Sequence, residues 1–173
     1  MIPILRSARP GEADRLSALV MRSKAYWGYD AAFLEKCLPA LRVSTAMIRV
    51  FPNRVAEIDG YPAGFAMIDS KDDPAEVLLL FVEPSAMGRG IGRALFTWLE
   101  TEARRAGRAA LRIEADPGAV PFYERCGARR TGAWAPSEAD AARYLPVLVR
   151  SLRGDLGGVL PDGPGSRQIR GNL

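Results

Sequence analysis

The sequence predicts an α+β protein in which helices flank a mixed central sheet of about seven strands. Three strand patterns follow one another over residues 46–82 before a long helical pattern begins near Ile91. Strands and helices do not alternate regularly along the chain, which argues against a doubly wound parallel sheet. The 173 residues suit one domain that buries on the order of two thirds of its unfolded surface.

The N-terminal part is expected to supply one strand and two helices. Residues 2–6 have the composition of a short strand, and the Pro-Gly-Glu segment at residues 10–12 opens an amphipathic helix. Asp30 can cap a second helix, whose apolar residues extend to Leu41. Pro39 should end or bend that helix, because proline lacks the backbone donor that the helix interior needs.

The middle of the chain contains the three consecutive strand patterns. Strand-like runs occupy residues 46–58 and are interrupted near Pro52. The Asp-Gly pair at residues 59–60 is typical of a hairpin turn, so residues 63–68 should form the return strand. A polar turn then leads into an apolar strand at residues 76–82.

The C-terminal part should complete the sheet. After the long helix, residues 109–115 predict a strand, and Pro117 can start a short helix. The last two strands are expected at residues 129–134 and 144–152.

The composition is that of one soluble domain. Hydrophobic residues make up 48% of the chain, and no apolar run approaches the roughly 20 residues that cross a bilayer. We expect one domain over residues 1–153 and a disordered tail over residues 154–173, which are rich in glycine and lack apolar periodicity. The start of the chain has no pattern of a secretory signal, so we expect a cytoplasmic protein without membrane contact.

The chain contains no histidine, and this restricts its chemistry. Ser-His and Cys-His nucleophiles and the usual zinc sites are excluded, and Cys37 and Cys126 have no metal-ligand spacing. We therefore expect no metal. Catalysis would have to use carboxylate, tyrosine, lysine or backbone groups, with Cys126 as a buried structural thiol.

The charge is moderately basic, with a formal net charge of +4 and a pI near 9.4. The arginines are scattered, and no basic run carries interleaved aromatic residues, so nucleic-acid binding is the weaker interpretation. A solvated surface that partly serves an anionic ligand explains the charge better.

Residues 78–96, LLLFVEPSAMGRGIGRALF, join a buried strand to a helix through a glycine loop. The helix start aims unpaired N–H groups and the positive end of the helix dipole at one point, which favours a phosphate. The loop lacks the third glycine of the dinucleotide fingerprint and the Gly-Lys pair of a P-loop. It predicts a pyrophosphate site, although a glycine turn that only packs helix on strand is the alternative.

This loop resembles the acyl-CoA loop of the GNAT N-acyltransferase superfamily, Arg/Gln-x-x-Gly-x-Gly/Ala, with the usual Val-x-Pro before it at residues 82–84. Met87 departs from the first position of that pattern. In the family the pyrophosphate is held by main-chain amides, so a changed side chain there need not abolish binding.

A second stretch, from Asp116, resembles the superfamily segment Asn-x-x-Ala-x-x-Phe-Tyr-x-x-x-Gly-Phe. Phe122, Tyr123 and Gly127 are in register, whereas Asp116 and Ala128 depart from it. The resemblance covers about residues 2–152 and implies a GNAT fold with the order β-αα-βββ-α-β-α-ββ.

The resemblance implies acetyl-CoA as co-substrate. The coenzyme-binding residues that it implies are Val82, Met87, Gly88, Arg89, Gly90, Ile91, Gly92, Arg93, Asp116 and Phe122.

Acetyl transfer from a thioester to an amine needs a base for the amine and a proton donor for the leaving thiolate. The resemblance implies Glu76 as the base, at the start of the central strand, with Glu83 or an ordered water as the alternative. Tyr123 matches the tyrosine that protonates the thiolate in the family. A backbone N–H near Val82 is the expected donor to the thioester carbonyl.

Three aromatic side chains, Tyr26, Trp27 and Tyr29, lie between the two predicted N-terminal helices. They could form a hydrophobic plug that joins the helices or a wall that contacts the acceptor. In GNAT proteins this connection flanks the acceptor site, and the segment resembles the Ser-Lys-Ala-x-Trp-Gly-Tyr stretch of some small bacterial members. The resemblance therefore implies substrate contacts at all three.

The leading interpretation is an N-acetyltransferase that moves an acetyl group from acetyl-CoA to a primary amine of a small molecule or peptide by direct attack on the thioester. Met87 keeps a second interpretation open, a noncatalytic acyl-CoA-binding regulatory module. The acceptor and a homodimer are left open, because aromatic residues suit apolar and cationic acceptors alike.

Overall fold

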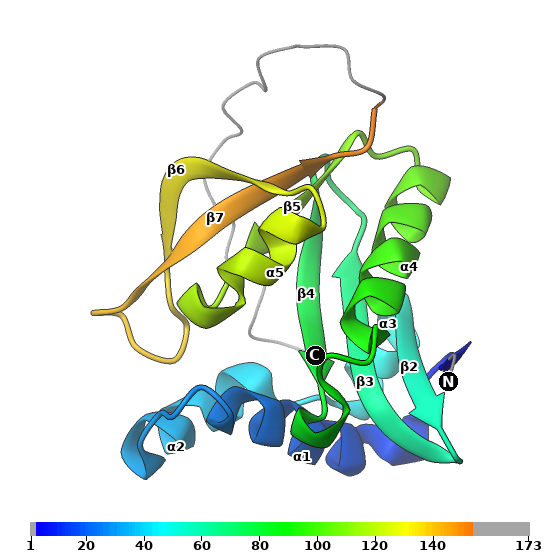
Figure 1. The fold of residues 1–173 in the computed structure, drawn as a ribbon, viewed down its shortest axis with the longest axis vertical. Helices are drawn as coiled ribbons and strands as arrows, with labels where there is room; N and C mark the ends of the chain where they lie inside the picture. The colour runs from blue at the N-terminus through cyan, green and yellow to red at the C-terminus, as the bar shows by residue number, and fades with distance from the viewer. Residues whose placement is uncertain (1–2, 154–173) are drawn as a thin grey trace.

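The computed structural model describes residues 3–153, in which helices pack on both faces of a seven-stranded sheet (Figure 1). The elements in chain order are β1 (Ile4–Arg6), η1 (Pro10–Glu12), α1 (Ala13–Ala25), α2 (Ala31–Leu41), α3 (Thr45–Val50), β2 (Asn53–Ile58), β3 (Tyr61–Asp69), β4 (Ala75–Val82), η2 (Pro84–Ala86), α4 (Ile91–Arg105), β5 (Ala110–Glu114), η3 (Pro117–Ala119), α5 (Val120–Arg125), β6 (Arg129–Pro136) and β7 (Tyr144–Ser151). The tail predicted at residues 154–173 lies outside the described residues.

The predicted fold class is confirmed. The strands run across the sheet in the order β1-β2-β3-β4-β5-β7-β6, and every neighbouring pair is antiparallel except β4 and β5. None of the helices within residues 3–153 has the length and apolar character needed to cross a bilayer.

One local prediction was wrong, because residues 45–50 form the helix α3 rather than a strand. The Ser44 side chain accepts a hydrogen bond from the Met47 N–H and so caps the helix start. Ile48 is buried against the sheet, but a helix of six residues is too short to show helical periodicity in the sequence. Pro39 does not end the second helix, since α2 continues past it to Leu41.

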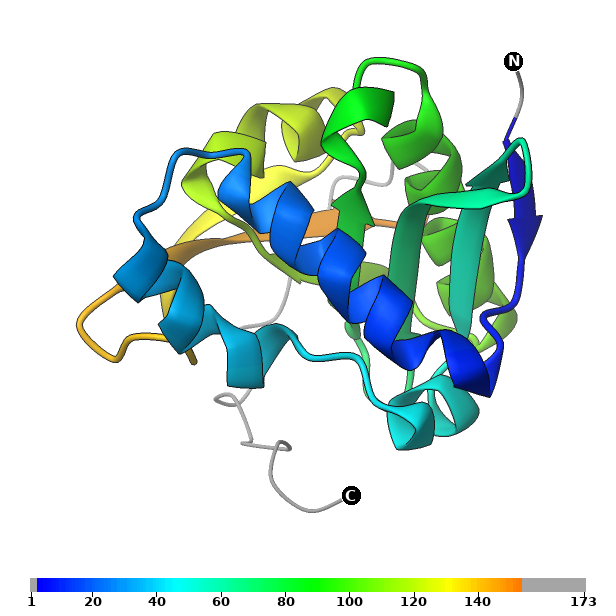
Figure 2. The same ribbon diagram turned by 90° about the horizontal axis from the view of Figure 1, so that it is seen from below.

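The two faces of the sheet bury two different cores. Side chains on one face, such as Phe65 and Met67 of β3, pack with α1, and those on the other, such as Ala66 and Ile68, pack with α4. This alternation follows from the two-residue period of a strand. Seen from below, α1 and α2 lie across the sheet on the face opposite α4 (Figure 2).

The sheet opens between β4 and β5. Their parallel pairing is limited to Ala75 with Leu111 and Glu76 with Arg112. Beyond that point β4 continues against β3, and β5 continues against β7. The two central strands therefore diverge toward their C-terminal ends.

We predict that Gly64→Ala destabilises the fold, because β3 and α4 approach each other at this glycine. A Cβ at Gly64 would lie 2.8 Å from Ile91 Cγ2 and 2.9 Å from Leu95 Cδ1, and both of those side chains are fully buried. Overpacking of this kind costs about 1 to 3 kcal/mol in the free energy of unfolding, which urea titration measures. Gly11→Ala is the control, since a Cβ there meets no atom within 4 Å. Equal stability of the two variants would contradict the prediction.

Candidate active site

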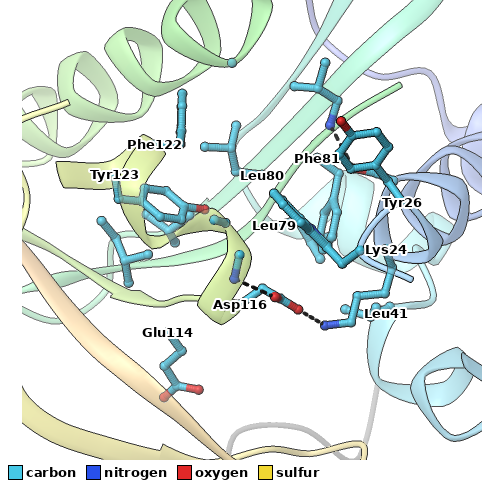
Figure 3. Close-up of a pocket in the computed structure, with 18 of the residues that line it drawn as sticks. Lys24, Tyr26, Leu41, Leu79, Leu80, Phe81, Glu114, Asp116, Phe122 and Tyr123 are labelled. Atoms are coloured by element: carbon cyan, nitrogen blue, oxygen red, sulfur yellow. Dashed lines mark hydrogen bonds and ion pairs between the residues drawn. The ribbon is translucent and has the colours of Figure 1, made fainter. Parts of the chain in front are cut away.

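A cavity of about 620 Å³ opens where β4 and β5 diverge. Its walls come from β4, the glycine loop before α4, the η3–α5 segment, the connection between α1 and α2, and the loop between β6 and β7. Figure 3 shows Phe122 and Tyr123 projecting from α5 toward Leu79 and Leu80 of β4. The cavity therefore joins segments that are far apart in the chain.

The glycine loop presents open backbone to this cavity. Gly88 and Gly90 have φ angles of 75° and 81°, and a Cβ at either position would meet no atom within 4 Å. Gly90 is the N-cap of α4, so the N–H groups of the first turn have no intrahelical acceptor. Gly92 serves packing instead, since a Cβ there would lie 3.1 Å from Phe122 Cε2. The loop thus forms a cradle with free amides, which suits an anionic ligand.

Most of the predicted coenzyme residues line this cavity. Those that do are Val82, Met87, Gly88, Gly90, Gly92, Arg93, Asp116 and Phe122. The side chain of Ile91 is instead buried in the core, and Arg89 is exposed outside the cavity lining. The Val82 N–H donates to the Ser23 hydroxyl at 3.4 Å, which is longer than an ordinary hydrogen bond.

Tyr123 is buried against aromatic neighbours, with its ring centroid 5.9 Å from that of Phe96 and 5.1 Å from that of Phe122. Within residues 3–153, every side-chain oxygen that is fully buried has a hydrogen-bond partner. The Tyr123 hydroxyl has no such partner within the described chain, so it is not fully buried and its oxygen reaches the cavity surface. Burial raises the pKa of Tyr123 well above its ordinary value. The phenol is therefore neutral at physiological pH and can donate a hydrogen bond.

Glu76 lies at the point where β4 and β5 part. Its carboxylate lines the cavity 3.7 Å from the Arg112 guanidinium, and its side chain is 40% exposed. Arg112 pairs more closely with Glu114, at 2.5 Å, and Glu114 also lines the cavity. Glu83 does not line it and forms two hydrogen bonds of 2.9 Å with Arg22 instead.

The three predicted aromatic residues separate into two groups. Tyr26 and Trp27 line the cavity and pack edge to face with ring centroids 5.4 Å apart. Tyr29 does not line it, and its hydroxyl donates to Asp116 instead. The α1–α2 connection lies beside the η3–α5 segment (Figure 2), and a Cβ on Gly118 of η3 would come within 2.5 Å of the Trp27 ring.

Sequence reasoning missed a charged cluster at this corner of the cavity, made by Lys24, Tyr29, Asp116 and Arg143. Lys24 Nζ lies 2.5 Å from Asp116 Oδ2, and Arg143 Nη2 lies 3.5 Å from the same oxygen. Burial alone would raise the pKa of Asp116, but Lys24, Tyr29 and the Gly118 N–H outweigh it and lower that pKa. The departure of Asp116 from the family's asparagine was the visible sequence signal.

Comparison with known proteins places the chain in a family. A family model described as an acetyltransferase (GNAT) domain matches residues 41–146. The chain is 35% identical over 116 residues to an uncharacterized N-acetyltransferase of Methanocaldococcus jannaschii. This match covers 60% of this chain and 51% of that protein. It is also 35% identical over 80 residues to the IAA acetyltransferase of Azospirillum brasilense, and this match covers 44% of this chain and 52% of that protein.

Solved structures share the fold. A GCN5-related N-acetyltransferase from Rhodopseudomonas palustris has a TM-score of 0.71 at 22% identity, over 87% of this chain and 96% of that one. The PaiA N-acetyltransferase of Thermoplasma acidophilum, solved in complex with coenzyme A, has a TM-score of 0.70 at 18% identity, over 87% and 99%.

Because the family model matches more than half of the 173 residues, the chain belongs to the GNAT acetyltransferase family. The matched regions span about half the length of the curated relatives.

We predict that the buried Tyr123 phenol makes stability depend on alkaline pH. The unfolded phenol ionises near pH 10, whereas the folded one keeps its proton to a higher pH, so folding is progressively disfavoured above about pH 10. The free energy of unfolding of the wild type should fall relative to that of Tyr123→Phe by up to about 1.4 kcal/mol per pH unit. Urea titrations from pH 9 to 11 measure this, with the exposed Tyr61→Phe as control. Parallel pH curves for wild type and Tyr123→Phe would contradict it.

Proposed function

We propose that the protein is an N-acetyltransferase that moves an acetyl group from acetyl-CoA to a primary amine of a small molecule or peptide, and that it acts in the cytoplasm. The observation that carries the proposal is that the cavity of about 620 Å³ brings the free amides of the glycine loop together with Glu76 and Tyr123. These are the parts that acyl transfer to an amine requires, namely an anion cradle, a base and a hydrogen-bond donor for the leaving thiolate.

The glycine loop would hold the coenzyme through its backbone. The open space at Gly88 and Gly90 admits phosphate oxygens to the amides of the first turn of α4. Arg93, which lines the cavity and donates to the Arg125 carbonyl at 2.8 Å, adds positive charge nearby. Met87 supplies no charge, so the amides and Arg93 would carry the anion recognition in this chain.

The carboxylate of Glu76 would prepare the acceptor. An alkylamine of pKa about 10.4 must lose a proton before it attacks, which costs about 4.6 kcal/mol at pH 7. Glu76 lies on the cavity wall and can accept that proton directly or through a water. The amine nitrogen then bonds to the acetyl carbon as the carbon–sulfur bond breaks. The proton that the new amide nitrogen must lose passes to solvent water, and the sulfur leaves as a thiolate.

The phenol of Tyr123 would stabilise the leaving sulfur. Acetyl-CoA, when bound, supplies the activated acyl group as a thioester. The pKa of Tyr123 lies above that of an ordinary thiol, about 8.5, so full proton transfer to a thiolate is uphill. Hydrogen-bond donation to the developing thiolate avoids that cost and still lowers the barrier.

The proposal is tested by incubating the protein with acetyl-CoA and a panel of amines while thiol release and coenzyme affinity are measured. Thiol release that depends on an amine, with a matching acetylated product, is the expected result. Coenzyme binding without release for any amine would favour the noncatalytic acyl-CoA-binding module. Absence of coenzyme binding would overturn both.

We predict that Gly90→Val abolishes coenzyme binding measured by calorimetry, because the new side chain fills the open side of the loop and strains a φ of 81°. Gly60→Val is the matched control. Gly60 has a φ of 80° and equally open surroundings, but it lies in the β2–β3 turn away from the cavity. Similar affinities in the two folded variants would show that the loop is not the binding site.

We predict that Glu76→Gln lowers turnover by about 10² to 10⁴-fold, the usual contribution of a base. Tyr123→Phe should lower it by about 10² to 10³-fold, the usual cost of removing one hydrogen-bond donor to a developing anion. The Glu76→Gln defect should shrink as pH rises, because more acceptor is then already unprotonated. Tyr123→Phe should keep its coenzyme affinity within a few-fold. A pH–rate profile measures both effects with a working acceptor.

Glu83→Gln is the comparison variant for the base, since its carboxylate pairs with Arg22 outside the cavity lining. A larger loss for Glu83→Gln than for Glu76→Gln would transfer the role of base to Glu83. Undiminished turnover in Tyr123→Phe would remove the phenol from the mechanism.

A further inference from the structure

We propose that Asp116 is a positioning residue that ties the aromatic wall of the cavity to the segment carrying Tyr123. The wall is the pair Tyr26 and Trp27 in the α1–α2 connection. Asp116 stands at the N-cap of η3, which leads directly into α5. One carboxylate would thus hold the proposed acceptor side and the proposed hydrogen-bond donor, Tyr123, in one arrangement.

Both oxygens of Asp116 are bound by groups of the chain itself. Oδ1 accepts from the Gly118 N–H at 3.1 Å and from the Tyr29 hydroxyl at 3.0 Å. Oδ2 accepts from Lys24 Nζ at 2.5 Å and from the same hydroxyl at 2.9 Å. The side chains of Lys24 and Asp116 are only 11% and 13% exposed, so solvent screens this pair less than a surface pair. Dashed lines in Figure 3 mark the bonds of Asp116 to Lys24 and to the η3 backbone.

The loop between β6 and β7 joins the same cluster through Arg143. Its guanidinium donates to the Tyr29 hydroxyl and lies 3.5 Å from the Asp116 carboxylate. It also stacks over the rings of Tyr29 and Phe33, at 4.6 and 4.8 Å from their centroids. Asp116 is therefore the anion that lets Lys24 and Arg143 approach one another.

Trp27 depends on this arrangement because it packs on the backbone of η3. The Trp27 ring occupies the space that a side chain on Gly118 would need, with Cε3 2.5 Å from the position of that Cβ. Lys24 and Tyr29 bracket Trp27 in sequence and both bind Asp116. The two anchors hold the intervening connection against η3.

This role differs from the coenzyme contact that the sequence pattern implies for Asp116. Both carboxylate oxygens are already engaged by donors of the chain, and a carboxylate repels phosphate. Loss of the charge should therefore affect the acceptor side more than the coenzyme side.

The first test is a fluorescence measurement that does not depend on acetyltransferase activity. In a Trp98→Phe/Trp134→Phe background, Trp27 is the sole tryptophan, and acrylamide quenching of its fluorescence reports its contact with η3. Asp116→Asn should raise the quenching constant, because Lys24 and Arg143 are then left as two facing cations. Tyr29→Phe, which removes the bridging hydroxyl and keeps all charges, should raise it less.

Glu100→Gln is the matched control for Asp116→Asn. The Glu100 carboxylate is also 13% exposed and pairs with Arg150 at 2.6 Å, but neither residue lines the cavity. Its quenching constant should equal that of the parent. An unchanged constant in folded Asp116→Asn, or an equal rise in Glu100→Gln, would overturn the proposal.

The second test rests on the proposed function and uses a working acceptor. Asp116→Asn should raise the acceptor KM about tenfold, which corresponds to about 1.4 kcal/mol, while the coenzyme Kd from calorimetry stays within a few-fold. Removing the excess cation with Lys24→Met in the same chain should restore part of the loss. Gly118→Ala, which displaces Trp27 sterically, should give the same acceptor-specific defect.

The outcomes separate this proposal from the proposed function. If Asp116→Asn raises the quenching constant in a protein that acetylates no amine, the result supports the anchoring of Trp27 and contradicts only the proposed transferase activity. Equal losses of acceptor and coenzyme affinity in Asp116→Asn would make Asp116 a coenzyme contact and overturn the positioning role. The rises in acceptor KM caused by Lys24→Met and Asp116→Asn could also prove strictly additive in the double variant. That result would overturn the positioning role as well, because substitutions at two coupled charges are not additive.

Discussion

The separation of β4 from β5 is the constraint on which the rest of this structure depends. A central strand normally satisfies its backbone groups on both edges, yet β4 pairs with β5 at only two residue pairs. Beyond them, within the described chain, the edge of β4 that faces β5 borders a cavity instead of a strand. Backbone groups that lack a strand partner are satisfied by side chains, as the Val82 N–H is by the Ser23 hydroxyl, or by water or a ligand. The opening between β4 and β5 therefore provides space for a ligand and also presents backbone groups that a ligand can bind.

Local chemistry made the strand, loop and helix around residues 78–96 predictable from sequence. A buried apolar run, a proline and three glycines act over a few residues, so their meaning does not depend on distant parts of the chain. The six-residue helix α3 escaped prediction because its cap at Ser44 was not recognised and its one buried residue, Ile48, shows no period. The opening between β4 and β5 depends on the register of strand pairing, which a single sequence does not reveal.

The cavity was foreseen only in part, for a related reason. Tyr26, Trp27 and Tyr29 are neighbours in sequence, but Gly28 between them has a φ of 79° and redirects the chain. Tyr29 consequently faces Asp116, while the other two face the cavity. Lys24 and Asp116 are 92 positions apart, so no window of sequence contains their contact. The departure from the family pattern at Asp116 marked the place without identifying the partner.

The contact between Trp27 and Gly118 constrains how this site can change. The ring fills the space beside the η3 backbone, so any side chain at position 118 must displace it. A smaller residue at position 27 would free that space and enlarge this end of the cavity. The two positions therefore form one unit for evolution or engineering, in which a new acceptor shape is reached by paired substitutions more readily than by single ones.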